Sequence, residues 1–97
     1  MDDEVIHSAA YQIVAVRRAD GRAVHVGYTT RDEGAVLQRL FGAWRDGWYG
    51  LLQRDCRQAF GAGEAWTTEL LEICGRRVLH SKVAGWRRQL ADAGEPL

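Results

Sequence analysis

The first third of the chain has the apolar pattern of a β-hairpin. β-branched and aromatic residues gather over residues 10–17, which predicts a strand there. The pair Asp20-Gly21 follows, and Asp-Gly between two apolar runs is a strong signal for a tight hairpin turn. Residues 23–29 are therefore expected to form the partner strand.

The turn also determines which side chains share a face of the hairpin. If the Asp-Gly pair alone forms the loop, Val16 lies opposite His25 and Val14 lies opposite Gly27. Side chains that lie opposite one another on paired strands point to the same side of a sheet. Val14, Val16 and His25 are therefore expected on one face.

The middle of the chain changes to helical spacing. Apolar residues recur three or four positions apart over residues 33–46, which predicts a first helix there. They are Val36, Leu37, Leu40, Phe41 and Trp44. Asp32 and Glu33 stand near its start, where the positive end of the helix dipole favours acidic side chains. After a glycine-flanked break, residues 51–60 predict a shorter second helix.

The last third predicts one strand and one helix. Residues 66–74 combine Trp, Thr and Ile without Gly or Pro, so a strand is favoured. A helix is the alternative, because the segment also contains leucine and glutamate. After Gly75, an amphipathic stripe predicts a helix from about residue 77 to residue 93. The stripe consists of Leu79, Val83, Trp86 and Leu90.

These elements give the order ββααβα and a single α+β domain. We expect a three-stranded, mainly antiparallel sheet packed against helices. Residues 1–9 are expected to be a flexible N-terminus, residues 10–93 the domain and residues 94–97 a C-terminal tail. A chain of 97 residues has room for one hydrophobic core and not for a second domain.

Charge and cysteine content narrow the function classes. Thirteen Lys and Arg residues balance thirteen Asp and Glu residues, whereas proteins that follow a nucleic-acid backbone usually have a strongly basic face. The pairs Arg76-Arg77 and Arg87-Arg88 are interpreted first as solvated helix ends and faces, and second as a nucleic-acid patch. Cys56 and Cys74 are too far apart for a CxxC unit. The acidic start predicts no secretory signal, so a reduced, cytoplasmic setting is expected. The apolar runs are much shorter than the ~20 residues that span a bilayer, so no membrane partner is expected.

Two triplets on the predicted hairpin resemble the signature of a known family. They are Gln12-Ile13-Val14 and His25-Val26-Gly27, and the second begins eleven residues after the first ends. This spacing and the order ββααβα resemble the GIY-YIG nuclease domain over residues 10–93. Ile13 and Gly27 are identical to letters of the family signature. The resemblance implies a GIY-YIG-like fold.

The resemblance also implies where a site would lie. In the family, two signature tyrosines, an arginine on the first helix and a metal-binding glutamate on the last helix hydrolyse phosphodiesters. Carried over by position, Val14 and His25 replace the tyrosines, and Lys82 replaces the glutamate. Arg39 matches the arginine best, and Arg31 is the alternative. Three of the four roles thus fall on a different residue type.

These replacements change the chemistry that the site can perform. Mg²⁺ needs carboxylate oxygens and Lys82 would repel it, so metal-dependent hydrolysis of the family type is not expected and no metal site is predicted. Beside Arg39, Lys82 would instead hold a phosphate or carboxylate group. His25 can accept a proton near neutral pH, which would permit metal-independent acid–base chemistry. The simpler interpretations are a hydrogen-bonded histidine and a solvated lysine.

The leading hypothesis is an altered GIY-YIG-like domain that binds an anionic small molecule or nucleic acid in the former nuclease groove. Its catalytic residues would be His25, Arg39 and Lys82. Its other ligand-binding residues would be Val14, Gly27, Tyr28, Arg31, Trp48 and Tyr49. No cofactor is expected. The alternatives are a DNA endonuclease with a rebuilt site and a non-catalytic interaction module, with a homodimer as one form of assembly. The sequence leaves open whether the chain is an enzyme.

Overall fold

The computed structural model describes residues 10–45, 56, 58 and 62–95. Within them, three antiparallel strands form a sheet with the order β2-β1-β3. The elements are β1 (Tyr11–Arg17), β2 (Ala23–Thr29), α2 (Gly34–Arg45), β3 (Thr67–Cys74), the 3₁₀-helix η2 (Arg76–Val78) and α4 (Leu79–Asp92). The α+β class and the antiparallel sheet predicted from the sequence are confirmed.

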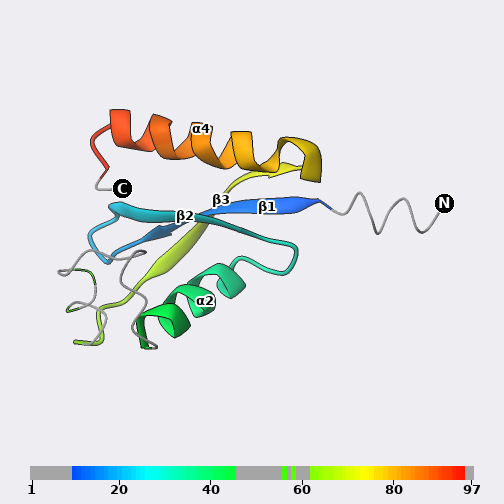
Figure 1. Cartoon of the computed structure of the whole chain (residues 1–97). Helices are drawn as coiled ribbons and strands as arrows, with labels where there is room; N and C mark the ends of the chain where they lie inside the picture. Colours follow the sequence, from blue (N-terminus) through cyan, green and yellow to red (C-terminus); the bar gives the residue numbers. More distant parts are fainter. Residues whose placement is uncertain (1–9, 46–55, 57, 59–61, 96–97) are drawn as a thin grey trace.

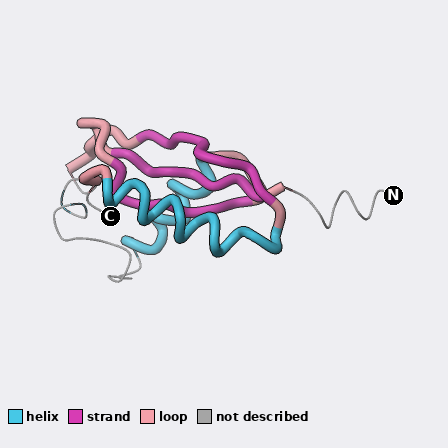
Figure 2. The backbone as a smooth tube through the Cα atoms, turned by 90° about the horizontal axis from the view of Figure 1, so that it is seen from above, coloured by secondary structure: helices cyan, strands magenta, loops and turns pink. Residues whose placement is uncertain are grey.

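The sheet lies between α4 on one face and α2 on the other (Figure 1). Seen from above, the strands lie side by side and α4 runs along them (Figure 2). β1 is the central strand of the sheet. Four consecutive residues of it, 13–16, are fully buried because helices cover both faces of the strand. Burial on both faces explains why the apolar run of β1 is continuous rather than alternating.

Each face of the sheet has its own hydrophobic core. The core beneath α2 contains Val14, Val16, Val36, Leu40 and Cys56. The core beneath α4 contains Ile13, Val26, Leu79 and Val83, with Trp86 and Leu90 packed against it. Successive residues of β1 alternate between the two cores, as the two-residue period of a strand requires. The apolar stripe predicted for the last helix is therefore confirmed.

The turn between β1 and β2 is one residue longer than predicted. The backbone nitrogen of Arg18 donates to the carbonyl of Arg22 at 3.0 Å, which leaves three residues in the loop. Gly21 also donates to the carbonyl of Arg18, at 2.8 Å. Gly21 has φ +88°, a left-handed conformation that glycine adopts without a steric cost. Three-residue loops with a left-handed glycine are common in hairpins.

A bulge in β2 restores the predicted register. Arg17 pairs with Ala23, whereas Val16 pairs with His25, which leaves Val24 as the extra residue. A shift of one residue moves a side chain to the other face of a strand. The bulge therefore compensates for the longer turn, and the predicted pairing of Val16 with His25 is confirmed, as is the next predicted pair.

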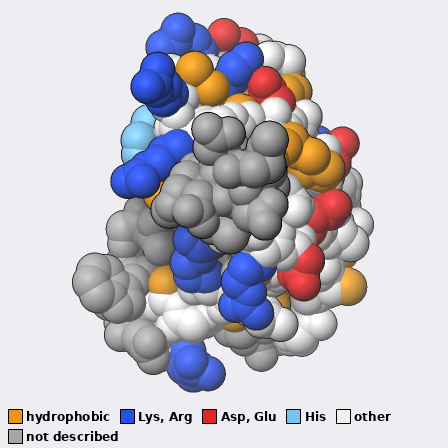
Figure 3. Space-filling view, turned by 90° about the vertical axis from the view of Figure 1, so that its right-hand side faces the viewer, with side chains coloured by type: hydrophobic (Ala, Val, Ile, Leu, Met, Phe, Trp, Pro, Cys, Tyr) orange, Lys and Arg blue, Asp and Glu red, His pale blue; other side chains and the backbone are white. Residues whose placement is uncertain are grey.

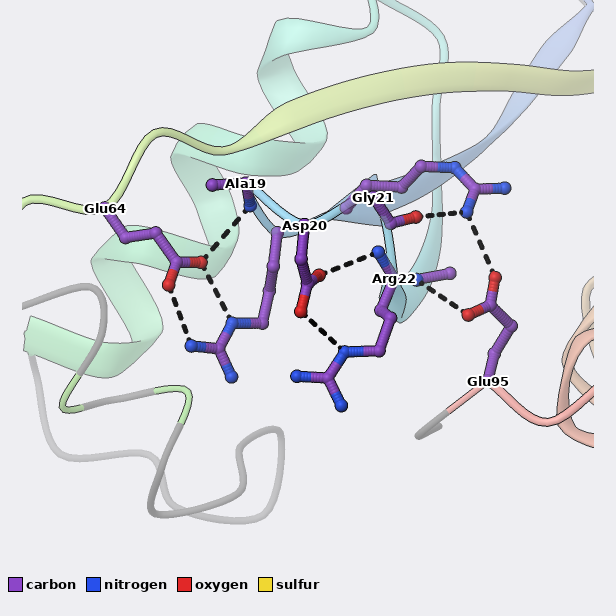
Figure 4. A network of polar contacts seen from close by, with 9 residues as sticks. Ala19, Asp20, Gly21, Arg22, Glu64 and Glu95 are labelled. Atoms are coloured by element: carbon purple, nitrogen blue, oxygen red, sulfur yellow. Dashed lines mark hydrogen bonds and ion pairs between the residues drawn. The ribbon is translucent and has the colours of Figure 1, made fainter.

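Charged contacts hold the end of the hairpin (Figure 4). Glu64, which precedes β3, accepts hydrogen bonds from the Arg18 guanidinium at 2.9 Å and 2.8 Å, one on each carboxylate oxygen. Arg17 pairs with Glu69 of β3 at 2.8 Å and with Glu95, beyond α4, at 3.1 Å. Segments far apart in the sequence are thereby tied to the same end of the hairpin.

The two described α-helices lie close to their predicted ranges. The helix expected over residues 33–46 corresponds to α2, and the helix expected over residues 77–93 corresponds to η2 followed by α4. Oδ1 of Asp32 accepts a hydrogen bond from the backbone nitrogen of Ala35 at 3.1 Å. This bond satisfies one of the free N–H groups at the start of α2.

Other predicted segments are confirmed or fall outside the described residues. The strand expected over residues 66–74 is confirmed as β3. The helix expected over residues 51–60 is described only at Cys56 and Gln58, which are both helical. The N-terminal residues 1–9 are outside the described part. No described helix is both long enough and apolar enough to cross a membrane.

Candidate functional site

Two arginines from opposite faces of the sheet cap the free edge of β2. β2 is an edge strand, so alternate carbonyls along it point away from β1. Nη2 of Arg39, on α2, donates to the carbonyl of Tyr28 at 2.6 Å. Nη2 of Arg87, on α4, donates to the carbonyl of Val26 at 2.9 Å. The two guanidinium groups thus lie on the same edge, on either side of Gly27.

Gly27 lets the imidazole of His25 and the helix α2 approach β2 closely. A Cβ atom on Gly27 would lie 2.9 Å from Cγ1 of Val36 and 3.1 Å from Nε2 of His25. His25 and Gly27 are two positions apart on the strand, so they face the same side of the sheet. The imidazole therefore lies on the α2 side, next to the edge that the arginines cap.

His25 lies in a positive environment. Burial, followed by the charges of Arg87 and Arg39, lowers the pKa of His25 from 6.5 to about 4. The imidazole is therefore neutral at pH 7, with one ring nitrogen as a donor and the other as an acceptor. An anion placed between these groups would offset the arginine charges and raise the pKa of His25.

A small hollow of about 210 Å³ opens between these side chains. It is lined by His25, Gly27, Tyr28, Val36, Arg39, Leu40, Ala43 and Arg87. A guanidinium has five N–H donors, and the bond to the strand uses one donor of each arginine. Within the described part of the chain, neither guanidinium pairs with a carboxylate. Both arginines therefore retain donors for an anion.

A larger hollow of about 590 Å³ adjoins the small one. It is lined by Tyr11, Tyr28, Thr29, Thr30, Arg31, Ala35, Gln38 and Arg39. The two hollows are neighbours because Tyr28 and Arg39 line both. The rings of Tyr11 and Tyr28 meet edge to face, with centroids 6.1 Å apart. The guanidinium carbon of Arg39 lies 6.0 Å from the centre of the Tyr28 ring, within range of a cation–π interaction.

Hydrogen bonds hold the loop at the rim of the larger hollow. Nε2 of Gln12 donates to the carbonyl of Arg31 at 2.8 Å, and the backbone nitrogen of Arg31 donates to Oγ1 of Thr29 at 2.9 Å. Both bonds use the main chain of Arg31, so its guanidinium is not occupied by them.

On the end of the molecule shown in Figure 3, Lys and Arg side chains gather on the left and along the middle, and Asp and Glu side chains on the right.

Lys82 lies apart from His25 and Arg39. Its Nζ is 3.0 Å from Oε2 of Glu72 on β3, and Nε1 of Trp86 donates to the other oxygen of the same carboxylate at 2.9 Å. These residues line a separate hollow. β3 and β2 are the two outer strands of the sheet. The Lys82 ammonium is thus paired with a carboxylate of β3, on the side of the sheet away from β2. It does not line the hollow around His25.

The remaining predicted ligand-binding residues divide into three groups. Those that line a hollow are Gly27, Tyr28 and Arg31. Val14 is fully buried in the core beneath α2 and lines neither hollow. Trp48 and Tyr49 lie outside the described residues.

No acidic side chain of the described part lines either of the two hollows around Tyr28. The acidic side chains paired with basic ones include Glu64, Glu69, Glu72 and Glu95. Among the described residues, no group of three or more His, Cys, Asp or Glu side chains is placed to hold a metal ion. The polar groups of the two hollows around Tyr28 are therefore arginines, hydroxyl groups, the amide of Gln38 and a neutral imidazole.

Arg87 is the residue that the sequence interpretation missed. The sequence favoured a solvated helix face for it; the residue is exposed, and its guanidinium in addition reaches the edge of β2. A signal was present, because Arg87 stands four residues after the buried Val83 and so borders the apolar stripe of α4. A long side chain at such a border can extend along the apolar surface and place its charged end at the sheet edge.

Comparisons with known proteins do not assign this chain to a family. No protein-family model matches it, and neither curated proteins nor solved structures give a significant match. The resemblance to the GIY-YIG nuclease domain therefore rests on the spacing of two triplets and on the order of the elements, and it stays a prediction.

Proposed function

We propose that this chain binds a small anionic ligand through a phosphate or carboxylate group in the small hollow at the edge of β2. The observation that carries the proposal is the placement of Arg39 and Arg87. They reach one strand edge from opposite faces of the sheet, and neither has a carboxylate partner among the described residues. A guanidinium presents a planar fork of N–H donors that matches the oxygens of such groups.

His25 contributes a hydrogen bond to this ligand rather than a charge. Its pKa of about 4 keeps the free imidazole neutral at pH 7. Once an anion is bound, the same imidazole has a higher pKa, because the negative charge favours its protonated form. Metal-independent acid–base chemistry at His25 would therefore require the ligand to be in place.

The proposal agrees with an altered GIY-YIG-like domain. His25 and Arg39 are the residues that the resemblance puts at a tyrosine position and at the arginine position. Their shared hollow supports a ligand site at the place where the family has its own site. Arg87 supplies the second positive charge that the sequence hypothesis gave to Lys82.

An NMR titration with inorganic phosphate tests the proposal. The ring signals of His25, assigned with a His25→Gln variant, should move when phosphate replaces chloride at matched ionic strength. The pKa of His25 should rise above about 4 as phosphate saturates the site. Arg87→Met should abolish both effects, because methionine keeps an apolar side chain but removes the guanidinium.

Two variants control for general changes in charge. Arg88→Met removes the neighbouring arginine of α4, and Lys82→Met removes the lysine that pairs with Glu72. Both should leave the phosphate response of His25 intact. A His25 signal that phosphate does not move would overturn the proposal. So would a response that is lost in Lys82→Met and retained in Arg87→Met.

A further inference from the structure

The larger hollow adjoins the proposed anion site. Tyr28 and Arg39 line both hollows, so the two hollows lie next to one another. A volume of about 590 Å³ lies within the range of pockets that bind small molecules, roughly 300–1,000 Å³. At about 210 Å³ the small hollow is below that range and suits a single charged group.

The lining of the larger hollow combines aromatic rings and neutral polar groups with the two arginines Arg31 and Arg39. Tyr11 and Tyr28 supply two rings, and a planar ring of a ligand can stack on such side chains. Gln38 and Thr30 line the same hollow. An amide offers both a donor and an acceptor, and a hydroxyl can act as either. This set of groups matches a flat heterocycle that carries donors and acceptors on its edge.

We propose that the anionic ligand is a mononucleotide. Its phosphate lies in the small hollow between Arg39 and Arg87, and its base and ribose lie in the larger hollow against Tyr11 and Tyr28. This inference rests on the proposed function, because the anion site fixes one end of the ligand. Arg39 lies within cation–π range of the Tyr28 ring and lines both hollows. It would therefore be near both the phosphate end and the base end of the ligand.

The charge of the chain favours a mononucleotide over a nucleic-acid strand. A strand presents many phosphates, and proteins that bind one carry a strongly basic track. Here thirteen basic residues are balanced by thirteen acidic ones. In the described part, Arg17, Arg18, Arg22 and Lys82 are paired with carboxylates, so these four side chains do not add to a basic track.

Calorimetric titration of the full chain with a set of related compounds tests the inference. The set is inorganic phosphate, ribose phosphate, adenosine, AMP and a single-stranded DNA oligonucleotide. AMP should bind roughly tenfold or more tightly than ribose phosphate, which corresponds to about 1.4 kcal/mol or more from stacking the base. Adenosine without the phosphate should bind much more weakly than AMP.

Variants separate the two hollows. Tyr11→Leu should remove the advantage of AMP over ribose phosphate while phosphate still binds. Tyr28→Leu should also remove this advantage, and it tests a residue that lines both hollows. Arg87→Met should weaken phosphate and AMP alike. Tyr11 and Tyr28 lie in different strands, so the two substitutions do not disturb the same backbone segment.

The outcomes distinguish this inference from the function on which it rests. If phosphate binds but AMP binds no more tightly than ribose phosphate, the base has no site and the mononucleotide is excluded, while the anion site stands. If neither phosphate nor AMP binds, the anion site itself is excluded. If the oligonucleotide binds about a hundredfold more tightly than AMP, the ligand is a strand and the inference is overturned.

Discussion

Gly27 makes room for the imidazole of His25: a Cβ atom on Gly27 would lie 3.1 Å from Nε2 of His25. On the same side it would lie 2.9 Å from Cγ1 of Val36. The absence of a side chain at this position lets the ring and α2 share the surface of β2. It also keeps the imidazole close to Arg39 and Arg87, whose charges lower its pKa.

A side chain at position 27 should therefore destabilise the protein. Gly27→Ala should lower the free energy of unfolding by about 1–3 kcal/mol, the usual cost of overpacking a filled region. The matched control is Gly85→Ala on α4, where an added Cβ meets nothing within 4 Å. That substitution should stabilise the protein by up to ~1 kcal/mol, because alanine is the better helix former. Urea denaturation measures both, and equal effects would contradict this account of Gly27.

The stability of the protein should depend on pH through His25. The pKa of His25 is 6.5 in its ordinary state and about 4 in the folded protein. Between these values the unfolded chain takes up a proton that the folded chain does not. The contribution of His25 to the free energy of unfolding is complete above pH 6.5 and is lost as the pH falls to about 4. It amounts to about 3 kcal/mol.

Comparison with His25→Gln isolates this contribution. Asp20, Glu64 and Glu72 have lowered pKa values, so they also reduce stability as the pH falls, but they do so in both proteins. The difference in the free energy of unfolding should therefore change between pH 6.5 and about 4 and be constant above pH 6.5. Parallel curves over this range would show that His25 keeps its ordinary pKa in the folded state.

The hairpin could be predicted well because its signals are local. An Asp-Gly turn and an apolar run specify which strands pair, and the pairing of Val16 with His25 follows from them. The longer turn could not be predicted, but the bulge at Val24 compensates for it. The amphipathic stripe of α4 could also be predicted from the sequence, because the buried residues Leu79 and Val83 follow helical spacing.

The site could be predicted only in part because it depends on how distant elements meet. Lys82 and Arg87 are five positions apart on α4, and five residues turn a helix by about 140° beyond one full turn. The two side chains therefore leave α4 in different directions, Lys82 to Glu72 and Arg87 to the edge of β2. Which direction leads to His25 depends on the order of the strands, which no local pattern in this sequence reveals.

Removal of either capping arginine should raise the pKa of His25. Both cations disfavour the protonated imidazole, and the effect of Arg87 exceeds that of Arg39. Arg87→Met should therefore raise the pKa more than Arg39→Met, with part of the depression left because burial is the largest cause. NMR titration of the ring measures each value. Arg88→Met is the control, and a rise there as large as in Arg87→Met would show that general charge, not local placement, sets the pKa.

The pair of Lys82 and Glu72 makes a separate prediction. A hydrogen bond from Lys82 is the largest cause of the lowered pKa of Glu72, and the bond from Trp86 is the next. Lys82→Met should raise the pKa of Glu72 while the pKa values of His25 and Glu64 stay unchanged. Carboxyl carbon NMR follows the glutamates. A simultaneous change in the pKa of His25 would show that Lys82 acts on the site around His25, contrary to its pairing with Glu72.

The turn of the hairpin should be sensitive to substitution at Gly21 but not at Gly75. Gly21 has φ +88°, where a Cβ atom costs about 1–2 kcal/mol, so Gly21→Ala should lower the free energy of unfolding by about that amount. Gly21→Asn should cost less, because asparagine tolerates the left-handed region. Gly75 has φ −79°, and a Cβ atom there meets nothing within 4 Å, so Gly75→Ala should be nearly neutral. Beyond the bulge, β1 and β2 stay paired from Val16 with His25 to Gln12 with Thr29. The folded Gly21→Ala protein should therefore keep His25 on the α2 side and retain the wild-type phosphate response in NMR. Loss of that response would show that the turn itself sets the register.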